Sequence, residues 1–216
     1  MEKKERAMKI YRALKNEYGT VPRIFLDHTT SAQMLAAIIL SAQSTDAQIN
    51  KLTPKLFKKY RTVDDFASAN RRTLEKEIFS SGFYKSKAKR LIGCFKMIRG
   101  EYNGKIPETI PELVRLPGVG RKTANLVLSS MGRVEGIAVD THVGRLSRRF
   151  GLSTHSDPNK VEKDLMLLYP KSRWIEINGL FISHGRAVCA AKKPLCSECL
   201  LNKKKLCPRK GVKEAG

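Results

Sequence analysis

The stretch Leu116-Pro-Gly-Val-Gly-Arg-Lys122 places two glycines just before a segment with helical spacing. Across residues 123–131 the apolar side chains recur at positions i, i+3, i+4 and i+7, namely Ala124, Val127, Leu128 and Met131. Gly118 and Gly120 permit a tight turn, and the N–H groups at the start of the following helix can bind a phosphate. Because Pro111 can open a short helix over residues 111–116 before the turn, the stretch predicts helix, hairpin, helix. The alternative is an ordinary glycine-terminated helix joined to the next one.

The charge balance favours a polyanionic partner. Among the 216 residues, 42 Lys and Arg face 20 Asp and Glu, which gives a formal charge of +22. Such an excess is typical of nucleic-acid binders, while 41% hydrophobic residues indicate a globular protein rather than a basic tail. The longest apolar run, residues 34–40, is too short to span a bilayer, and the charged N-terminus is unlike a signal peptide. We therefore expect a cytoplasmic protein with no membrane partner.

Helical patterns dominate the rest of the chain. Apolar periods and capping residues predict helices over residues 2–18, 32–40, 46–60, 70–79, 91–102, 157–169 and 174–188, with a short one opening at 62–65. Residues 80–87 are predicted to form a glycine turn with two adjacent aromatic residues among lysines. No alternating run beside a hairpin dipeptide suggests a strand, so the fold class is predicted to be all-α.

Asp140 stands at the entrance of a further predicted helix, whose apolar residues include Val143, Leu146 and Phe150. A carboxylate at this position can serve simply as the N-cap of the helix. It can equally offer a fixed negative charge to a ligand. The two roles are compatible, because a capping carboxylate remains ionised.

Four cysteines near the C-terminus form the pattern C-x6-C-x2-C-x7-C, at Cys189, Cys196, Cys199 and Cys207. A reducing cytosol disfavours disulfides, so four closely spaced thiols predict a metal site, either tetrahedral zinc or an iron–sulfur cluster. The spacing does not separate these two. Basic residues lie between and after the cysteines: Lys192, Lys193, Lys203, Lys204, Lys205, Arg209 and Lys210. The remote Cys94 is expected to be a buried small hydrophobe.

Three motifs occur in order: residues 116–125, Val139-Asp-Thr-His142 and the four-cysteine terminus. Together they closely resemble the endonuclease III family, which are bifunctional DNA glycosylases and AP lyases of the helix-hairpin-helix superfamily with a glycine, proline and aspartate loop. The resemblance implies a six-helix domain over about 24–134, with the helix-hairpin-helix motif at about 110–129. A second helical domain, made of residues 1–23 and 135–216, would carry a 4Fe-4S cluster, and DNA would lie in the cleft between the domains.

The resemblance also implies catalytic roles for two residues. Lys122 matches the nucleophilic lysine and Asp140 the catalytic aspartate. A lysine amine can attack C1′ of a damaged nucleotide and form a Schiff base, which among protein side chains needs an amine. We expect burial, the helix N-terminus and Arg121 to help the Lys122 amine lose its proton.

Further matches imply contacts with DNA. Gln43 corresponds to the glutamine that enters the gap left by the extruded base, and Phe83 falls at the second intercalating position. The alternative for Phe83 is a core aromatic at a turn. Four residues around the hairpin, Gly118, Val119, Gly120 and Arg121, together with His142, are expected to bind the DNA. Lys85 and Lys87 would neutralise phosphates.

Two departures from the family pattern stand out. The last cysteine gap has seven residues where the family usually has five, which suggests an insertion within residues 202–205. All four ligands remain, so a 4Fe-4S cluster is still expected. Phe83 replaces the leucine that is common at its position, and this leaves the damage preference open.

The resemblance therefore implies a base-excision repair enzyme that removes oxidised pyrimidines and cleaves the resulting AP site by β-elimination. Its partner would be double-stranded DNA containing damaged pyrimidines or AP sites, and its location nucleoid-associated; a monomer is the default. One alternative is a monofunctional thymine or adenine mismatch glycosylase, which the presence of Lys122 disfavours. Another is a non-catalytic DNA-binding module with structural zinc.

Overall fold

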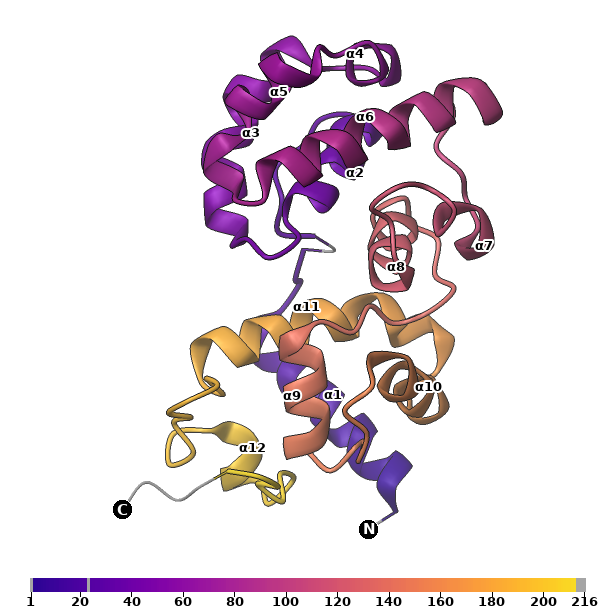
Figure 1. Cartoon of the computed structure of the whole chain (residues 1–216). Coiled ribbons are helices and arrows are strands. Elements are labelled where there is room, and N and C mark those ends of the chain that lie inside the picture. The colour runs from indigo at the N-terminus through magenta and orange to yellow at the C-terminus, as the bar shows by residue number, and fades with distance from the viewer. Residues whose placement is uncertain (1, 23, 213–216) are drawn as a thin grey trace. The chain divides into compact units, whose positions relative to one another are not determined.

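The helical periods of the sequence form helices in the computed structural model, which describes residues 2–22 and 24–212 (Figure 1). The α-helices are α1 Lys3–Tyr18, α2 Ser31–Leu40, α3 Asp46–Lys59, α4 Val63–Ala67, α5 Arg71–Glu77, α6 Tyr84–Glu101, α7 Ile110–Leu113, α8 Arg121–Ser130, α9 Thr141–Arg149, α10 Pro158–Leu168, α11 Trp174–Ala187 and α12 Leu200–Lys203. Two 3-10 turns are η1 Phe79–Ser81 and η2 Lys171–Arg173. The described residues contain no strand, and the predicted all-α fold is confirmed. None of their helices is long and apolar enough to cross a bilayer.

The contacts between residues divide the chain into two units. The central unit is Ile24–Arg133 and holds α2 to α8. The terminal unit combines residues 1–23 with 134–216, so that α1 from the start of the chain packs against α10, α11 and α12 from its end (Figure 1).

Polar side chains cap the N-termini of several helices in the central unit. Thr30, Thr45, Thr62 and Asn70 each accept a hydrogen bond from a backbone N–H in the first turn of α2, α3, α4 and α5. Thr62 and Asp65 form a reciprocal capping box at the start of α4. Local side-chain chemistry therefore explains why these helices start where they do.

The core of the central unit is built on α2, whose residues from Ala32 to Leu40 are all buried. Helices α6 and α8 pack against α2, and α4 packs along α6. The rings of Phe66 and Phe95 stack at 4.5 Å between their centroids across the α4–α6 contact. The nearly all-apolar sequence of α2 is thus that of a helix buried on every side.

Two predicted boundaries in the central unit are wrong. Helix α6 begins at Tyr84, seven residues before the predicted start at 91, because Lys87 and Ala88 are buried and belong to its inner face. The predicted turn over residues 80–87 therefore ends at Phe83. Helix α7 ends at Leu113, before the predicted end at Leu116, and the residues that follow it form turns that lead into the hairpin.

The core of the terminal unit lies between α1, α9, α10 and α11. From α1 it receives Ala7, Ile10, Tyr11 and Leu14. Phe150, after α9, meets Phe181 of α11 edge to face at 5.4 Å. This packing holds α9 against α11. Asp140 lies at the N-terminus of α9, and the C-terminus of α11 leads into the cysteines.

Candidate active site and cysteine cavity

Gly118 forms the corner of the hairpin between α7 and α8. Its φ is +86°, a left-handed conformation that side chains rarely adopt. A Cβ at this position would also lie 3.1 Å from Cβ of Arg90 and 3.5 Å from Ile39. The hairpin therefore needs glycine at position 118 for two separate reasons.

Gly120 is different, because neither strain nor packing demands a glycine there. Its backbone is extended, with φ −93° and ψ 178°, and a Cβ would meet no atom within 4 Å. Gly120 is the N-cap of α8 and leaves the first N–H groups of the helix uncovered by a side chain. Such an exposed helix start suits an approaching anion.

Three other hairpin residues lie beside Gly120. Val119 is buried in the core of the central unit, so any contact with DNA would involve its backbone. Arg121 and Lys122 occupy the first two positions of α8, and both are exposed. The expected burial of the Lys122 side chain is therefore not found in the central unit. The exposed side chain lies directly after the hairpin.

Asp140 is the N-cap of α9 in the terminal unit. Its Oδ1 accepts a hydrogen bond of 2.8 Å from the N–H of Val143, and the side chain is half-buried. Asn178 of α11 donates a hydrogen bond of 2.9 Å to the carbonyl of Ala138, which holds the segment leading to Asp140. The capping role is real, and it fixes the direction of the carboxylate.

His142 packs closely against α11. A Cβ on Gly185 would lie 2.6 Å from His142 Nδ1 and 3.0 Å from Nη2 of Arg145. Arg145 itself lies 3.1 Å from His142 Nδ1 and donates to the carbonyl of Cys189 at 3.0 Å. Gly185 therefore lets the helix that carries Asp140 approach the helix that leads into the cysteines.

Gln43 and Phe83 lie in two loops of the central unit that contact each other. Both have left-handed backbones, with φ +56° and +48°, and both side chains are exposed. The 68% exposure of Phe83 excludes the alternative of a core aromatic. Ser44 donates a hydrogen bond of 2.6 Å to the carbonyl of Ser81, which ties the two loops together.

A phosphate ligand is expected to reach solvent, but Lys87 is buried. Its side chain is only 3% exposed, and Nζ donates to Ser44 Oγ at 2.8 Å and to the carbonyl of Ser81 at 2.6 Å. Burial lowers the pKa of Lys87 to about 8. The expectation that Lys87 neutralises a phosphate is wrong, whereas Lys85 is exposed.

The four C-terminal cysteines line one small cavity, together with residues such as Arg149, Leu195 and Asn202. Burial raises the pKa of Cys207 to about 11 and also raises that of Cys199. Within the described part of the chain, no group of three His, Cys, Asp or Glu side chains is placed to hold a metal ion. Cys94 is fully buried in the central unit, where burial raises its pKa to about 12, as expected of an inert thiol.

Nitrogen groups lie within hydrogen-bonding distance of three of the four sulfurs. Arg149 Nη1 donates to Cys189 Sγ at 3.2 Å, and the same guanidinium donates to the carbonyls of Ala190 and Ala191. His184 Nε2 lies 3.5 Å from Cys199 Sγ, and the N–H of Arg209 donates to Cys207 Sγ at 3.4 Å. Donors of this kind stabilise thiolates, so the surroundings of the cavity suit metal-bound cysteines.

The long gap between Cys199 and Cys207 is taken up by α12 and its C-terminal turn. Lys205 has a φ of +54°, and the N–H of Leu206 bonds to the carbonyl of Leu201 at 2.8 Å. This is a Schellman-type ending, with Leu206 and Leu201 both buried. The residues of the suggested insertion therefore belong to an ordered turn.

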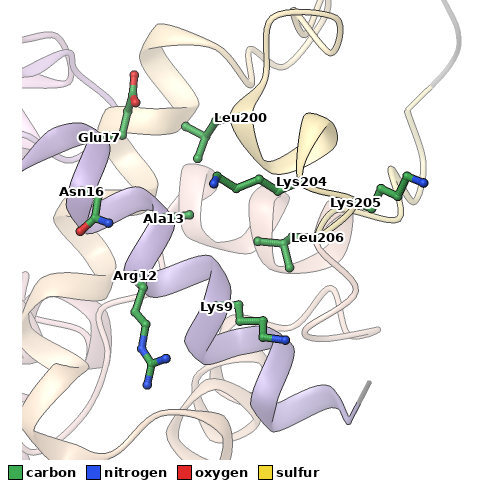
Figure 2. Close-up of a pocket in the computed structure, with 9 residues that line it drawn as sticks. All are labelled: Lys9, Arg12, Ala13, Asn16, Glu17, Leu200, Lys204, Lys205 and Leu206. Carbon is green, nitrogen blue, oxygen red and sulfur yellow. The ribbon is translucent and has the colours of Figure 1, made fainter.

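A basic pocket lies between α1 and the segment around α12 (Figure 2). Ala13, Leu200 and Leu206 give it an apolar component, and its cationic side chains are Lys9, Arg12, Lys204 and Lys205. Lys204 and Lys205 belong to the basic residues noted between the cysteines. The terminal unit thus presents part of the positive charge of the chain on one ordered surface.

Several residues of the site escape a reading of the sequence. They are Asn178, Gly185, His184 and Arg149. Each acts through a contact with a segment far away in the chain, and none stands in a local motif. Lys87 was predicted from the sequence only as a phosphate ligand, and its spacing of four residues from the apolar Leu91 was the one available signal of its inner position.

Comparisons with known proteins give a consistent picture. Residues 36–171 match the family model described as HhH-GPD superfamily base excision DNA repair protein. The chain is 47% identical to Endonuclease III of Synechocystis sp. over 95% of its length and 93% of the relative. It is 44% identical to Endonuclease III of Bacillus subtilis over 82% of its length and 81% of the relative.

Solved structures agree with the sequence relatives. A trapped Endonuclease III–DNA covalent intermediate matches with a TM-score of 0.90 and 39% identity, covering 97% of both chains. A thermostable thymine-DNA glycosylase matches with a TM-score of 0.82 at 21% identity, covering 95% of this chain and 96% of that one. The second match concerns the fold alone.

Proposed function

Because the chain belongs to the family of HhH-GPD superfamily base excision DNA repair proteins, we propose that it removes oxidised pyrimidines from double-stranded DNA and then cleaves the AP site. The resemblance seen in the sequence is confirmed at the level of the family. The chain is a DNA glycosylase and AP lyase, and its partner is duplex DNA. A nucleoid-associated location in the cytoplasm and a monomeric state complete the proposal.

The observation that carries the chemistry is the position of Lys122. Its exposed side chain starts α8 directly after the hairpin whose Gly120 leaves backbone N–H groups open to a phosphate. Gly118, Gly120 and Arg121 would hold the DNA backbone, while Val119 would contribute its main chain. An amine fixed beside a bound phosphate can reach the neighbouring deoxyribose.

The reaction follows from the amine. The lone pair of Lys122 Nζ attacks C1′, the bond from C1′ to the base breaks, and the base leaves with the electron pair and takes up a proton as Nζ loses one. Ring opening gives an imine between C1′ and Nζ. Loss of a proton from C2′ then expels the 3′ phosphate by β-elimination, and water releases the lysine.

Asp140 would supply a fixed negative charge to the positive sugar of the transition state. Its carboxylate is oriented by the hydrogen bond from Val143, and Asn178 supports the segment that precedes it. His142, one helical turn from Arg145, would contact the DNA from the same helix start. In this proposal the cap of α9 is part of the catalytic site.

The extruded base must be replaced in the duplex. Gln43 and Phe83, both exposed on adjoining loops, would enter the gap and hold the opposite strand. Lys85 would bind a neighbouring phosphate, and the cationic pocket shown in Figure 2 would add charge from the terminal unit. Such contacts make the affinity depend on salt.

A 4Fe-4S cluster held by Cys189, Cys196, Cys199 and Cys207 is proposed as the cofactor. The four thiols share one cavity and have donors from Arg149, His184 and Arg209 beside them, so the donor set fits a cluster. When bound, the cluster would hold this loop folded without taking part in the sugar chemistry. We further propose that the central and terminal units correspond to the six-helix and cluster domains.

Borohydride trapping on an AP-site duplex tests the catalytic proposal. The wild-type protein should form a covalent adduct, and Lys122→Ala should form none while still binding the duplex. Lys96→Met, at an exposed position of α6, is the matched control and should trap normally. An undiminished adduct in Lys122→Ala would exclude the lysine assignment. A monofunctional glycosylase would form no adduct with the AP-site duplex. A non-catalytic module would form none either, and on a duplex with a damaged pyrimidine it would leave the base in place.

Metal analysis of the protein purified without oxygen tests the cofactor. Iron and sulfide with broad visible absorption are expected, and Cys199→Ser should lower both. Cys94→Ala changes the remaining cysteine and should leave the iron content unchanged, because Cys94 lies in the core of the central unit. A colourless protein loaded with zinc would refute the cluster.

A further inference from the structure

The two loops that carry Gln43 and Phe83 hold both residues in a conformation that is costly for them. Their φ angles of +56° and +48° are left-handed, although neither residue is glycine. For a residue with a Cβ, this region is disfavoured by crowding between the Cβ and the backbone. The surrounding structure must therefore fix both loops in place, since local preference does not.

Lys87 lies where the two loops meet. It is one turn into α6 after Phe83, and its own N–H bonds to the carbonyl of Phe83 at 3.0 Å. Its Nζ donates to Ser44 Oγ at 2.8 Å and to the carbonyl of Ser81 at 2.6 Å. One side chain thus contacts the residue after Gln43 and a residue two positions before Phe83.

The hydrogen bonds around Lys87 close into a small network. Ser44 Oγ donates to the carbonyl of Ser81 at 2.6 Å, so Lys87, Ser44 and Ser81 bond to one another. Gln48 adds a second link between the loops by donating from Nε2 to the carbonyl of Ser80. The network joins segments that are 37 residues apart in the chain.

A lysine is an expensive choice for this buried position. The side chain is 3% exposed, and the oxygen atoms it contacts belong to a hydroxyl and a carbonyl, which carry no formal charge. Burying an amine in such surroundings costs free energy compared with an apolar residue. A residue that served packing alone would be apolar, whereas a donor that reaches two loops gives their relative position a defined geometry.

We propose that Lys87 is a positioning residue that holds the loops of Gln43 and Phe83 in one arrangement, so that both side chains enter the duplex together. This inference rests on the proposed function, because it assumes that these side chains replace the extruded base. Lys87 does not touch the sugar or the base in this scheme. It acts through the two loops that it joins.

The test compares two substrates with Lys87→Met, whose side chain keeps the apolar stem but donates no hydrogen bond. On a duplex with one oxidised pyrimidine, base removal in a single turnover should slow by about tenfold or more. The reason is that Gln43 and Phe83, once misplaced, no longer fill the gap that the extruded base leaves. On a single-stranded oligonucleotide with an AP site, no gap needs filling, and borohydride trapping should change by less than about twofold. Lys96→Met is the control and should behave as wild type on both.

A fluorescent base analogue opposite the lesion gives a readout independent of rate. Insertion of Gln43 and Phe83 should unstack the analogue and raise its emission with the wild-type protein. Lys87→Met should lose most of this rise at saturating protein, when binding itself is complete. If Lys87→Met raised the emission as much as the wild-type protein does, the proposal would be overturned. Equal losses of activity on the two substrates would also overturn it.

Ser44→Ala keeps the experiment decisive if Lys87→Met does not fold. This variant removes one acceptor of Lys87 and should show the same duplex-specific loss at a smaller size. Where both variants fold, the double variant should be little worse than Lys87→Met alone, since the residues act in one network. If the wild-type protein traps neither substrate, the proposed function fails and the role of Lys87 is not the cause.

Discussion

The hydroxyl of Tyr18 lies 2.9 Å from Nδ1 of His184, and Nε2 of the same ring lies 3.5 Å from Cys199 Sγ. Burial lowers the pKa of His184 to about 4 and raises that of Tyr18 to about 12, so the ring is neutral and the hydroxyl keeps its proton at neutral pH. When the Tyr18 hydroxyl donates to Nδ1, the single ring proton lies on Nε2, toward the sulfur. The first helix of the chain thus contacts the ring that lies beside the cysteine cavity.

Removing this hydroxyl should destabilise the protein. We expect Tyr18→Phe to lower the free energy of unfolding by about 1–2 kcal/mol, because a buried ring nitrogen loses its partner. Tyr102→Phe is the matched control, since the Tyr102 hydroxyl only accepts a weak, exposed hydrogen bond of 3.3 Å from Arg115. Urea unfolding followed by circular dichroism measures both. Equal effects of the two substitutions would contradict the role given to Tyr18.

The two hairpin glycines should respond differently to substitution. Gly118→Ala should cost about 1–2 kcal/mol or more, because alanine is strained at φ +86° and its Cβ would press on Arg90. Gly120→Ser should leave stability unchanged or raise it slightly, because serine is a good N-cap and the position is open. The affinity of the Gly120→Ser variant for duplex DNA, measured by fluorescence anisotropy, should nevertheless fall. An undiminished affinity would show that Gly120 does not face a phosphate.

Substitutions at Asp140 should separate capping from catalysis. Asparagine caps as well as aspartate but carries no charge, so Asp140→Asn should keep stability and slow base removal by about 100-fold or more. Asp157 caps α10 with the same geometry, accepting from Lys160 at 2.9 Å, and serves as the control. Asp157→Ala should cost about 1 kcal/mol of stability without slowing base removal. Normal catalysis by Asp140→Asn would reduce Asp140 to a cap.

The buried amine of Lys87 predicts a pH dependence of stability. Its pKa falls from an ordinary 10.5 to about 8 in the folded protein, so the unfolded chain binds more protons between these values. Below pH 8 the Lys87 amine is charged in both states, and its burial then lowers the free energy of unfolding by the full penalty. As pH increases from 8 to 10.5 this penalty is lost, so the free energy of unfolding should rise. Unfolding measured across this range should show a smaller rise in Lys87→Met than in the wild type. Parallel curves would contradict the lowered pKa.

The parts of the site that follow from the sequence are those written in short segments. The hairpin, the caps at Asp140 and Asp157, and the cysteine spacing depend on residues within a turn or two of one another, where backbone geometry and hydrogen bonding are local. Helix types follow for the same reason. The start of α6 was predicted too late because Lys87 is a charged residue, which the sequence pattern assigns to the surface. Lys87 is buried only through its contacts with another loop.

By itself, the sequence determined the helical class, the hairpin that presents Lys122, the cap at Asp140 and the set of four cysteines, because each is a local pattern of conformational preference and ligand chemistry. The tertiary structure decided which polar groups are withdrawn from water and which side chains stay exposed. Tyr18 meets His184 across 166 residues and Lys87 meets Ser44 across 43, and Phe83 is left exposed beside that second contact. Such pairings depend on how the helices pack, and packing is a property of the whole chain rather than of any segment.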